Sequence, residues 1–137
     1  MKTHRQNIAR RLLMLVLGAA ALVAPVAAQG PALAMLAGLQ DGLWEVRARD
    51  GSPARRICVR AGMELIQLQH REGGCSRFVV EDTANEVTVQ YTCRGNGYGR
   101  TNIRRETAGL VQIDTQGIES GMPFQFAAEA RRVGPCR

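Results

Sequence analysis

Residues 87–93, VTVQYTC, show the clearest strand pattern in this chain. Apolar and polar residues alternate along it, and a period of two is typical of a β-strand that buries one face. The segment GNG at residues 95–97 follows closely, and glycine beside asparagine is typical of the tight turn of a β-hairpin. These residues predict an antiparallel sheet in which one strand leads directly to the next.

The segments on either side repeat this pattern at short intervals. Besides 87–93, we expect strands at residues 44–49, 55–60, 78–82, 98–106, 110–115 and 124–131, with a loop at 117–123. Gly62–His70 differs, because the spacing of its apolar residues favours one short helix. The predicted fold class is mainly β (α+β): a curved antiparallel meander sheet of about six or seven strands, with a partly closed barrel as the close variant.

Residues 1–28 have the three parts of a signal peptide. Four basic residues and no acidic residue precede an apolar run from Leu12 to Val23, and small residues at 26–28 favour cleavage before Gln29. The apolar run is shorter than the roughly 20 residues that span a bilayer. We therefore expect a signal peptide over 1–28, a flexible lead-in over 29–37 and a single disulfide-bonded domain over 38–137. Such a protein would be exported, without a transmembrane segment in its mature chain.

The net charge of the whole 137-residue chain is +6, which by itself suggests a nucleic-acid partner. Residues 1–28, however, hold four of the 18 basic residues and none of the 12 acidic ones, so the remaining 109 residues carry a charge of about +2. Their arginines are scattered, and aromatic residues make up only 4% of the sequence. A nucleic-acid surface would concentrate both kinds of residue, so we expect no nucleic-acid partner.

Four cysteines lie in the part that would be exported, where thiols pair in an oxidising compartment. They are Cys58, Cys75, Cys93 and Cys136. Three connectivities are possible, and we favour the sequential one, Cys58–Cys75 with Cys93–Cys136. A structural zinc site usually takes two ligands from one turn, whereas no two of these cysteines are nearer than 17 positions and His70 is the only histidine after residue 28. We therefore expect two structural disulfides, no metal site and no cofactor.

The motifs contain no catalytic constellation. His70 has no nucleophile beside it in the sequence, and none of Ser52, Ser76 and Ser120 lies in a G-x-S-x-G motif. The glycine-rich GNGYG at 95–99 lacks the lysine and the helix of a phosphate-binding loop, so a hairpin turn is the simpler interpretation. We expect a binding protein rather than an enzyme.

Five segments of the chain carry a recognisable combination: GLWEV at 42–46, ICV at 57–59, GCS at 74–76, YTCRG at 91–95 and RRVGPC at 131–136. Together they resemble a bacterial exported family, "domain of unknown function 3617". The resemblance covers roughly residues 38–137 and implies a small periplasmic or envelope protein of a Gram-negative bacterium. It supports the two disulfides and implies no catalytic or binding residue.

Three functional hypotheses follow from these features. The leading one is a non-enzymatic periplasmic module that binds a small or lipophilic ligand on the concave face of its sheet, because curved sheets often hold a ligand at their mouth. The alternative is an envelope accessory protein that acts through protein–protein contacts, which a large exposed apolar patch on the sheet would favour. The third is a hydrolase built around His70.

Overall fold

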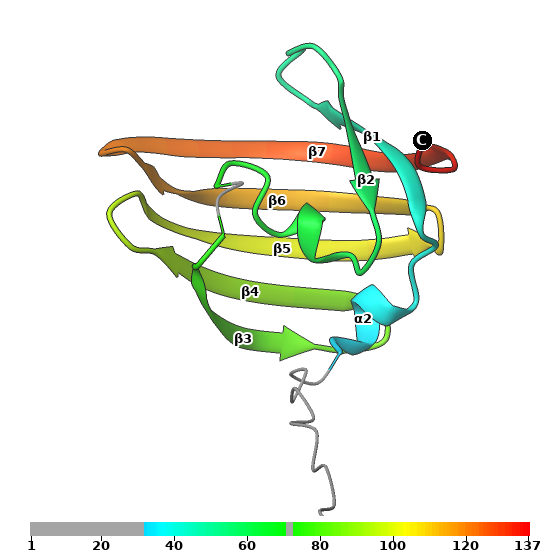
Figure 1. Cartoon of the computed structure of the whole chain (residues 1–137), viewed down its shortest axis with the longest axis horizontal. Helices are drawn as coiled ribbons and strands as arrows, with labels where there is room; N and C mark the ends of the chain where they lie inside the picture. The colour runs from blue at the N-terminus through cyan, green and yellow to red at the C-terminus, as the bar shows by residue number, and fades with distance from the viewer. Residues whose placement is uncertain (1–31, 71–72) are drawn as a thin grey trace, which may run out of the picture. The chain divides into compact units, whose positions relative to one another are not determined.

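A single antiparallel sheet of seven strands organises the described part of the chain (Figure 1). The computed structural model describes residues 32–70 and 73–137, so the predicted signal peptide at 1–28 and the start of the lead-in lie outside the described residues. The strands are β1 (Gly42–Ala48), β2 (Arg55–Val59), β3 (Ser76–Asp82), β4 (Glu86–Cys93), β5 (Gly97–Thr107), β6 (Leu110–Glu119) and β7 (Met122–Gly134). Their order in the sheet is β2-β1-β7-β6-β5-β4-β3. The predicted mainly β fold, with a meander through β3 to β7, is confirmed.

The sheet is open, so the partly closed barrel is not formed. β2 and β3 lie at its two edges and do not pair with each other. The loop predicted at 117–123 is also absent, because β6 and β7 extend to a two-residue turn at Ser120 and Gly121. Both turn residues have positive φ, 49° and 80°. Tight hairpin turns use this region of backbone conformation because it matches the twist of the flanking strands.

One face of the sheet, which we call the inner face, carries the core. It is the face on which Val46, Val89, Ile103, Ile113 and Ala128 lie, each at most 2% exposed. Ile103 is opposite Ile113 in the register, and Ile113 is opposite Ala128, so the apolar side chains form rows across the strands. The alternation read from residues 87–93 is therefore the alternation between the inner face and the opposite, outer face.

The segment that joins β2 to β3, residues 60–75 apart from the undescribed 71–72, covers the inner face. We call it the connection. Because β2 and β3 lie at opposite edges of the sheet, the chain must cross one face to reach β3, and in Figure 1 it runs in front of the sheet. Leu65, Ile66 and Leu68 are buried in it, and the Thr101 hydroxyl of β5 donates to the Ile66 carbonyl at 2.7 Å.

The helix predicted at 62–70 is wrong in extent. The structure contains only the 3₁₀ turn η1 (Met63–Leu65), and the chain continues without a helix through His70. The apolar spacing that favoured a helix reflects burial against the inner face instead.

The lead-in is folded where it is described. Helix α2 (Ala34–Ala37) lies at the end of the predicted lead-in and buries Met35 and Leu36. The Asp82 carboxylate at the end of β3 accepts hydrogen bonds from the backbone N–H groups of Ala34 and Met35, at 2.8 and 3.2 Å. A side chain that is distant in sequence therefore caps this helix.

The disulfide connectivity predicted from the sequence is wrong. The bridges join Cys58 to Cys136 and Cys75 to Cys93. The antiparallel register of β3 and β4 continues to place Cys75 opposite Cys93, with Cα atoms 4.2 Å apart. Cys58 of β2 pairs with Leu43 of β1, whose other neighbour is the end of β7, so Cys136 reaches Cys58 with Cα atoms 5.5 Å apart. Strand order, not order along the chain, decides which cysteines meet.

Candidate ligand-binding site

The inner face is not free along its length, because the connection and α2 pack on it. A cavity of about 400 Å³, which we call the inner-face cavity, lies against the connection on this side of the sheet. Its lining residues come from β2, η1, the connection and β3: Ile57, Met63, Glu64, Gln67, Leu68, His70, Gly73 and Arg77. The volume falls within the range of about 300–1,000 Å³ that is usual for small-molecule sites.

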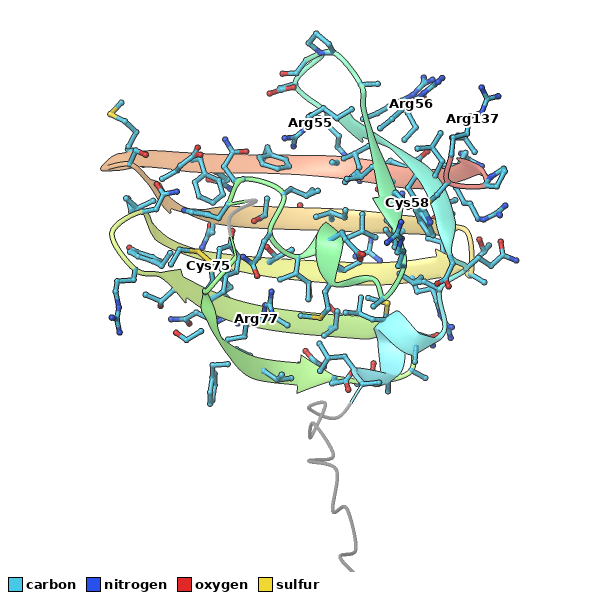
Figure 2. All side chains as sticks on the ribbon, viewed as in Figure 1. Arg55, Arg56, Cys58, Cys75, Arg77 and Arg137 are labelled. Atoms are coloured by element: carbon cyan, nitrogen blue, oxygen red, sulfur yellow. A yellow bond between two sulfur atoms is a disulfide. The ribbon has the colours of Figure 1, made fainter. Side chains whose placement is uncertain are left out.

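The wall of the cavity on the β3 side is polar and fixed. Figure 2 shows Arg77 projecting from β3 toward the connection, and its guanidinium donates from Nε to Gln67 Oε1 at 2.8 Å and also from Nη2 to the same oxygen. Gln67 Nε2 donates to the His70 carbonyl at 3.1 Å. The charged side chain of an edge strand therefore holds the connection in place above the sheet.

Glu64 supplies the unusual chemistry of this cavity. Its Oε1 accepts a hydrogen bond from the Arg60 backbone N–H at 3.1 Å. Its Oε2 is buried, and it has no hydrogen-bond partner in the described part of the chain. A buried acceptor without a partner costs roughly 1–3 kcal/mol, more when it carries charge. A ligand that donates a hydrogen bond to Oε2 would recover this free energy.

His70 is a structural residue at the far end of the cavity. Its side chain is fully buried, and Nε2 lies 3.1 Å from the Asn96 carbonyl oxygen and 3.0 Å from that of Ile118. Since carbonyl oxygens only accept, Nε2 carries the hydrogen, and in the neutral ring Nδ1 accepts from the Tyr91 hydroxyl at 3.1 Å. Burial and the negative charge of Glu119 raise the pKa of Tyr91 to about 12, which keeps this hydroxyl a donor.

This arrangement gives no support to the hydrolase hypothesis. Both ring nitrogens of His70 are engaged by Tyr91 and by backbone carbonyls. The hydroxyls of Ser76 and Ser120 donate elsewhere, to the Thr92 carbonyl at 3.5 Å and to Asn96 Oδ1 at 2.9 Å. His70 fastens the connection to the β4–β5 turn and to the end of β6.

Sequence reasoning singled out the four cysteines and His70 but missed Glu64, Gln67 and Arg77. The cysteines are all paired among the described residues, and none of them lines the cavity. Glu64 and Gln67 lie in the segment for which a short helix was predicted, and Arg77 is one of the scattered arginines. Nothing local in the sequence marks them, because the crossing of the connection brings them together.

Two further features of the described residues bear on the class of site. No group of three or more His, Cys, Asp and Glu side chains in residues 32–70 and 73–137 is placed to hold a metal ion. In the same residues, no helix combines the length and the hydropathy that a membrane-spanning helix requires.

The comparisons with known proteins identify a family and no activity. Neither the curated proteins nor the solved structures contain a significant match to this chain. One family does match, over residues 39–136, and this range includes every strand, the connection and all four cysteines. The chain therefore belongs to the family described as Protein of unknown function (DUF3617).

Proposed function

We propose that the protein is an exported, non-enzymatic binding protein that holds a small amphipathic ligand in the inner-face cavity. The single observation that carries this proposal is that Glu64 lines a partly apolar cavity and that its buried Oε2 has no hydrogen-bond partner among the described residues. Ile57, Met63 and Leu68 would contact an apolar tail, and Glu64 would accept from a donor group at the head of the ligand.

Two features support a periplasmic location for this function. The first 28 residues have the charge and hydropathy pattern of a cleavable export signal. Both cysteine pairs lie at disulfide distance, and structural disulfides persist in oxidising compartments such as the periplasm. N-terminal sequencing of the protein isolated from its native periplasm would begin near Gln29 under this proposal, whereas a start at Met1 would contradict it.

The head-group chemistry can be tested with two probes of equal charge. Decylamine carries a donor head on a ten-carbon tail, and decyltrimethylammonium has a comparable tail and the same charge but no N–H. We expect the wild-type protein to bind decylamine at least tenfold more tightly, measured by calorimetry below the critical micelle concentrations. In Glu64→Gln this preference should disappear. The carboxylate oxygen that accepts a hydrogen bond from the donor head is then replaced by an amide, which offers either an N–H₂ donor or a weaker, neutral oxygen acceptor.

The control for this experiment is Arg104→Gln on the outer face, which should leave the preference unchanged. Leu68→Trp, which fills the apolar part of the cavity, should weaken both probes together. Circular dichroism and urea unfolding would show that each variant is folded. Equal affinity of the wild-type protein for the two probes, or no binding of either, would refute the proposal.

A second function is favoured by a different observation, the exposed edge strand β3. Phe78 is 69% exposed, and Val79 and Val80 are each 43% exposed, on a strand whose far edge has no partner among the described residues. An unpaired apolar edge can accept a strand of another protein by main-chain hydrogen bonding. A photo-crosslinking residue at position 78 should then capture a defined envelope protein in cells, and the same group at position 104 should not.

This second candidate function would be tested by reconstituting the complex from the two purified proteins. Val80→Pro removes a backbone N–H from β3 and should abolish binding to the purified partner. If crosslinking is the same at positions 78 and 104, or if Val80→Pro binds normally, β3 is not the docking strand.

A further inference from the structure

The outer face of the sheet carries a row of polar side chains that the inner-face proposal leaves unused. Gln90 of β4 pairs with Arg100 of β5, Arg100 with Gln116 of β6, and Gln116 with Gln125 of β7. We call these four residues the polar row. Residues directly opposite each other on neighbouring strands share a face, and strands lie about 4.8 Å apart, so the row spans three strand spacings in a straight line.

The polar row lies in a hollow. A depression of about 570 Å³ is lined by the four residues together with Tyr98, Gly117, Pro123 and Phe124. A second depression of about 220 Å³ shares Arg100, Gln116 and Gln125 and continues toward Asn102 and Asp114. The two together form a groove that runs over the row.

The side chains of the polar row are free of polar contacts within the described residues. All four are exposed, and none of them makes a side-chain hydrogen bond or an ion pair in residues 32–70 and 73–137. The adjacent row on the same face differs, because Asn102 donates to Glu86 Oε1 at 2.8 Å and to Thr88 Oγ1 at 2.9 Å. The groove therefore presents unused donors and acceptors beside side chains that brace the sheet.

We propose that this groove binds a short acidic saccharide. The Arg100 guanidinium is a planar fork of donors that fits a carboxylate. Each Gln amide both donates and accepts, as sugar hydroxyls do. Tyr98, two residues before Arg100 on the same face and 50% exposed, offers a ring against which the apolar face of a sugar can lie.

Charge sets the orientation of the saccharide in the groove. Asp114 lines the smaller depression and repels an anion there, whereas the larger depression contains no acidic residue in its lining. One carboxylate of the ligand therefore lies on the Tyr98 and Gln90 side of Arg100, and the remaining sugar units extend toward β7 within the larger depression.

The experiment uses trigalacturonic acid as the probe and maltotriose as the uncharged comparison, both titrated by calorimetry into the mature protein. We expect binding of trigalacturonic acid that is at least tenfold tighter than that of maltotriose. Arg100→Gln should weaken it at least tenfold, Gln116→Ala should weaken it several-fold, and Arg100→Lys should fall between wild type and Arg100→Gln.

The matched control is Arg104→Gln, which removes an exposed arginine from the same strand and the same face but outside the groove. It should leave the affinity within about twofold of wild type. An equal loss of affinity in Arg104→Gln and Arg100→Gln would show that only the net charge of the protein attracts the saccharide, and it would overturn the proposal. Equal binding of the two saccharides, or none, would also overturn it, whereas Glu64→Gln should bind normally because it alters only the inner-face cavity.

Discussion

Tyr91 and Gly99 face each other across β4 and β5, and the tyrosine ring occupies the space that a side chain at residue 99 would need. A Cβ atom at Gly99 would lie 2.4 Å from the Tyr91 hydroxyl oxygen and 2.5 Å from its Cζ. The glycine therefore lets the ring lie flat against β5, where its hydroxyl reaches His70. One missing side chain thus allows the hydrogen bond that fastens the connection.

Gly99→Ala should destabilise the protein by about 1–3 kcal/mol, the usual cost of overpacking a well-packed core. The matched control is Gly134→Ala, because Gly134 is also in a strand but has open space where its Cβ would be. Urea unfolding of both variants gives the comparison. Equal stability of the two variants would contradict the role assigned to Gly99.

The raised pKa of Tyr91 predicts a loss of folding stability at alkaline pH. Its pKa is raised from 10.0 to about 12 in the folded protein, so its protonated form is favoured by folding. This contribution is complete below pH 10 and is lost as the pH rises from about 10 to 12, by up to about 2 kcal/mol after allowance for solvent screening. The free energy of unfolding, measured in urea at pH 9 and pH 11.5, should fall more in the wild type than in Tyr91→Phe.

Tyr91→Phe has its own effect at neutral pH. It removes the hydrogen bond to His70 Nδ1 and should cost about 1 kcal/mol there. Tyr98 is half exposed and stays in both proteins, so its titration cancels in the comparison. The same alkaline decline in wild type and variant would exclude Tyr91 as its source.

At the scale of elements, α2 depends on β3 for its first turn. A helix of four residues is too short to be stable alone, and its N–H groups at residues 34 and 35 are satisfied by Asp82. Met35 and Leu36 then pack against the core. The end of the lead-in is therefore ordered by a side chain 47 positions away from Met35.

Asp82→Ala should cost about 1 kcal/mol, the typical value for loss of a helix cap. The loss should be local, with faster amide exchange at Ala34 and Met35 and little change in β5 or β6. Glu81→Ala, an exposed neighbour on the same strand, is the control and should leave exchange at these amides unchanged. Unchanged exchange in Asp82→Ala would show that packing alone holds α2.

The elements also show how far the sequence could be read. Every expected strand exists, and the ends of β1, β2, β3 and β4 agree to within about two residues, because alternation is a local property. The helix predicted at 62–70 is wrong in extent because Ile66 and Leu68 are buried against a sheet that other segments of the chain form. The local spacing of apolar residues does not reveal that sheet. The same holds for the cavity, since no local pattern relates Glu64 to Arg77.

At the scale of the whole molecule, the two disulfides fasten opposite ends of the sheet order. Cys58–Cys136 joins edge strand β2 to the segment after β7 and closes 78 positions of chain, whereas Cys75–Cys93 joins β3 to β4 and closes 18. The chain-entropy model gives about 4.5 kcal/mol for the longer loop and about 3 kcal/mol for the shorter one. The longer bridge should therefore matter more to stability.

Replacing each pair of bridged cysteines by serine tests which disulfide contributes more to stability. The Cys58→Ser/Cys136→Ser variant should lose more stability in urea than the Cys75→Ser/Cys93→Ser variant. Peptide mapping of the oxidised wild type should recover the peptide pairs 58 with 136 and 75 with 93. A cross-link between Cys58 and Cys75 would restore the sequential pairing and refute the strand register described above.

The amino-acid pattern was enough to predict six or seven strands, the alternation of their two faces, and four cysteines that form disulfides. These features depend on the two-residue period of a strand and on composition, which neighbouring residues specify together. Only the tertiary structure decided that β1 lies beside β7, that the connection covers the inner face, which cysteines meet, and that Gln90, Arg100, Gln116 and Gln125 align. The reason is physical: strand order and register join residues that are distant along the chain, and their choice depends on the burial of the whole sheet rather than on any one segment.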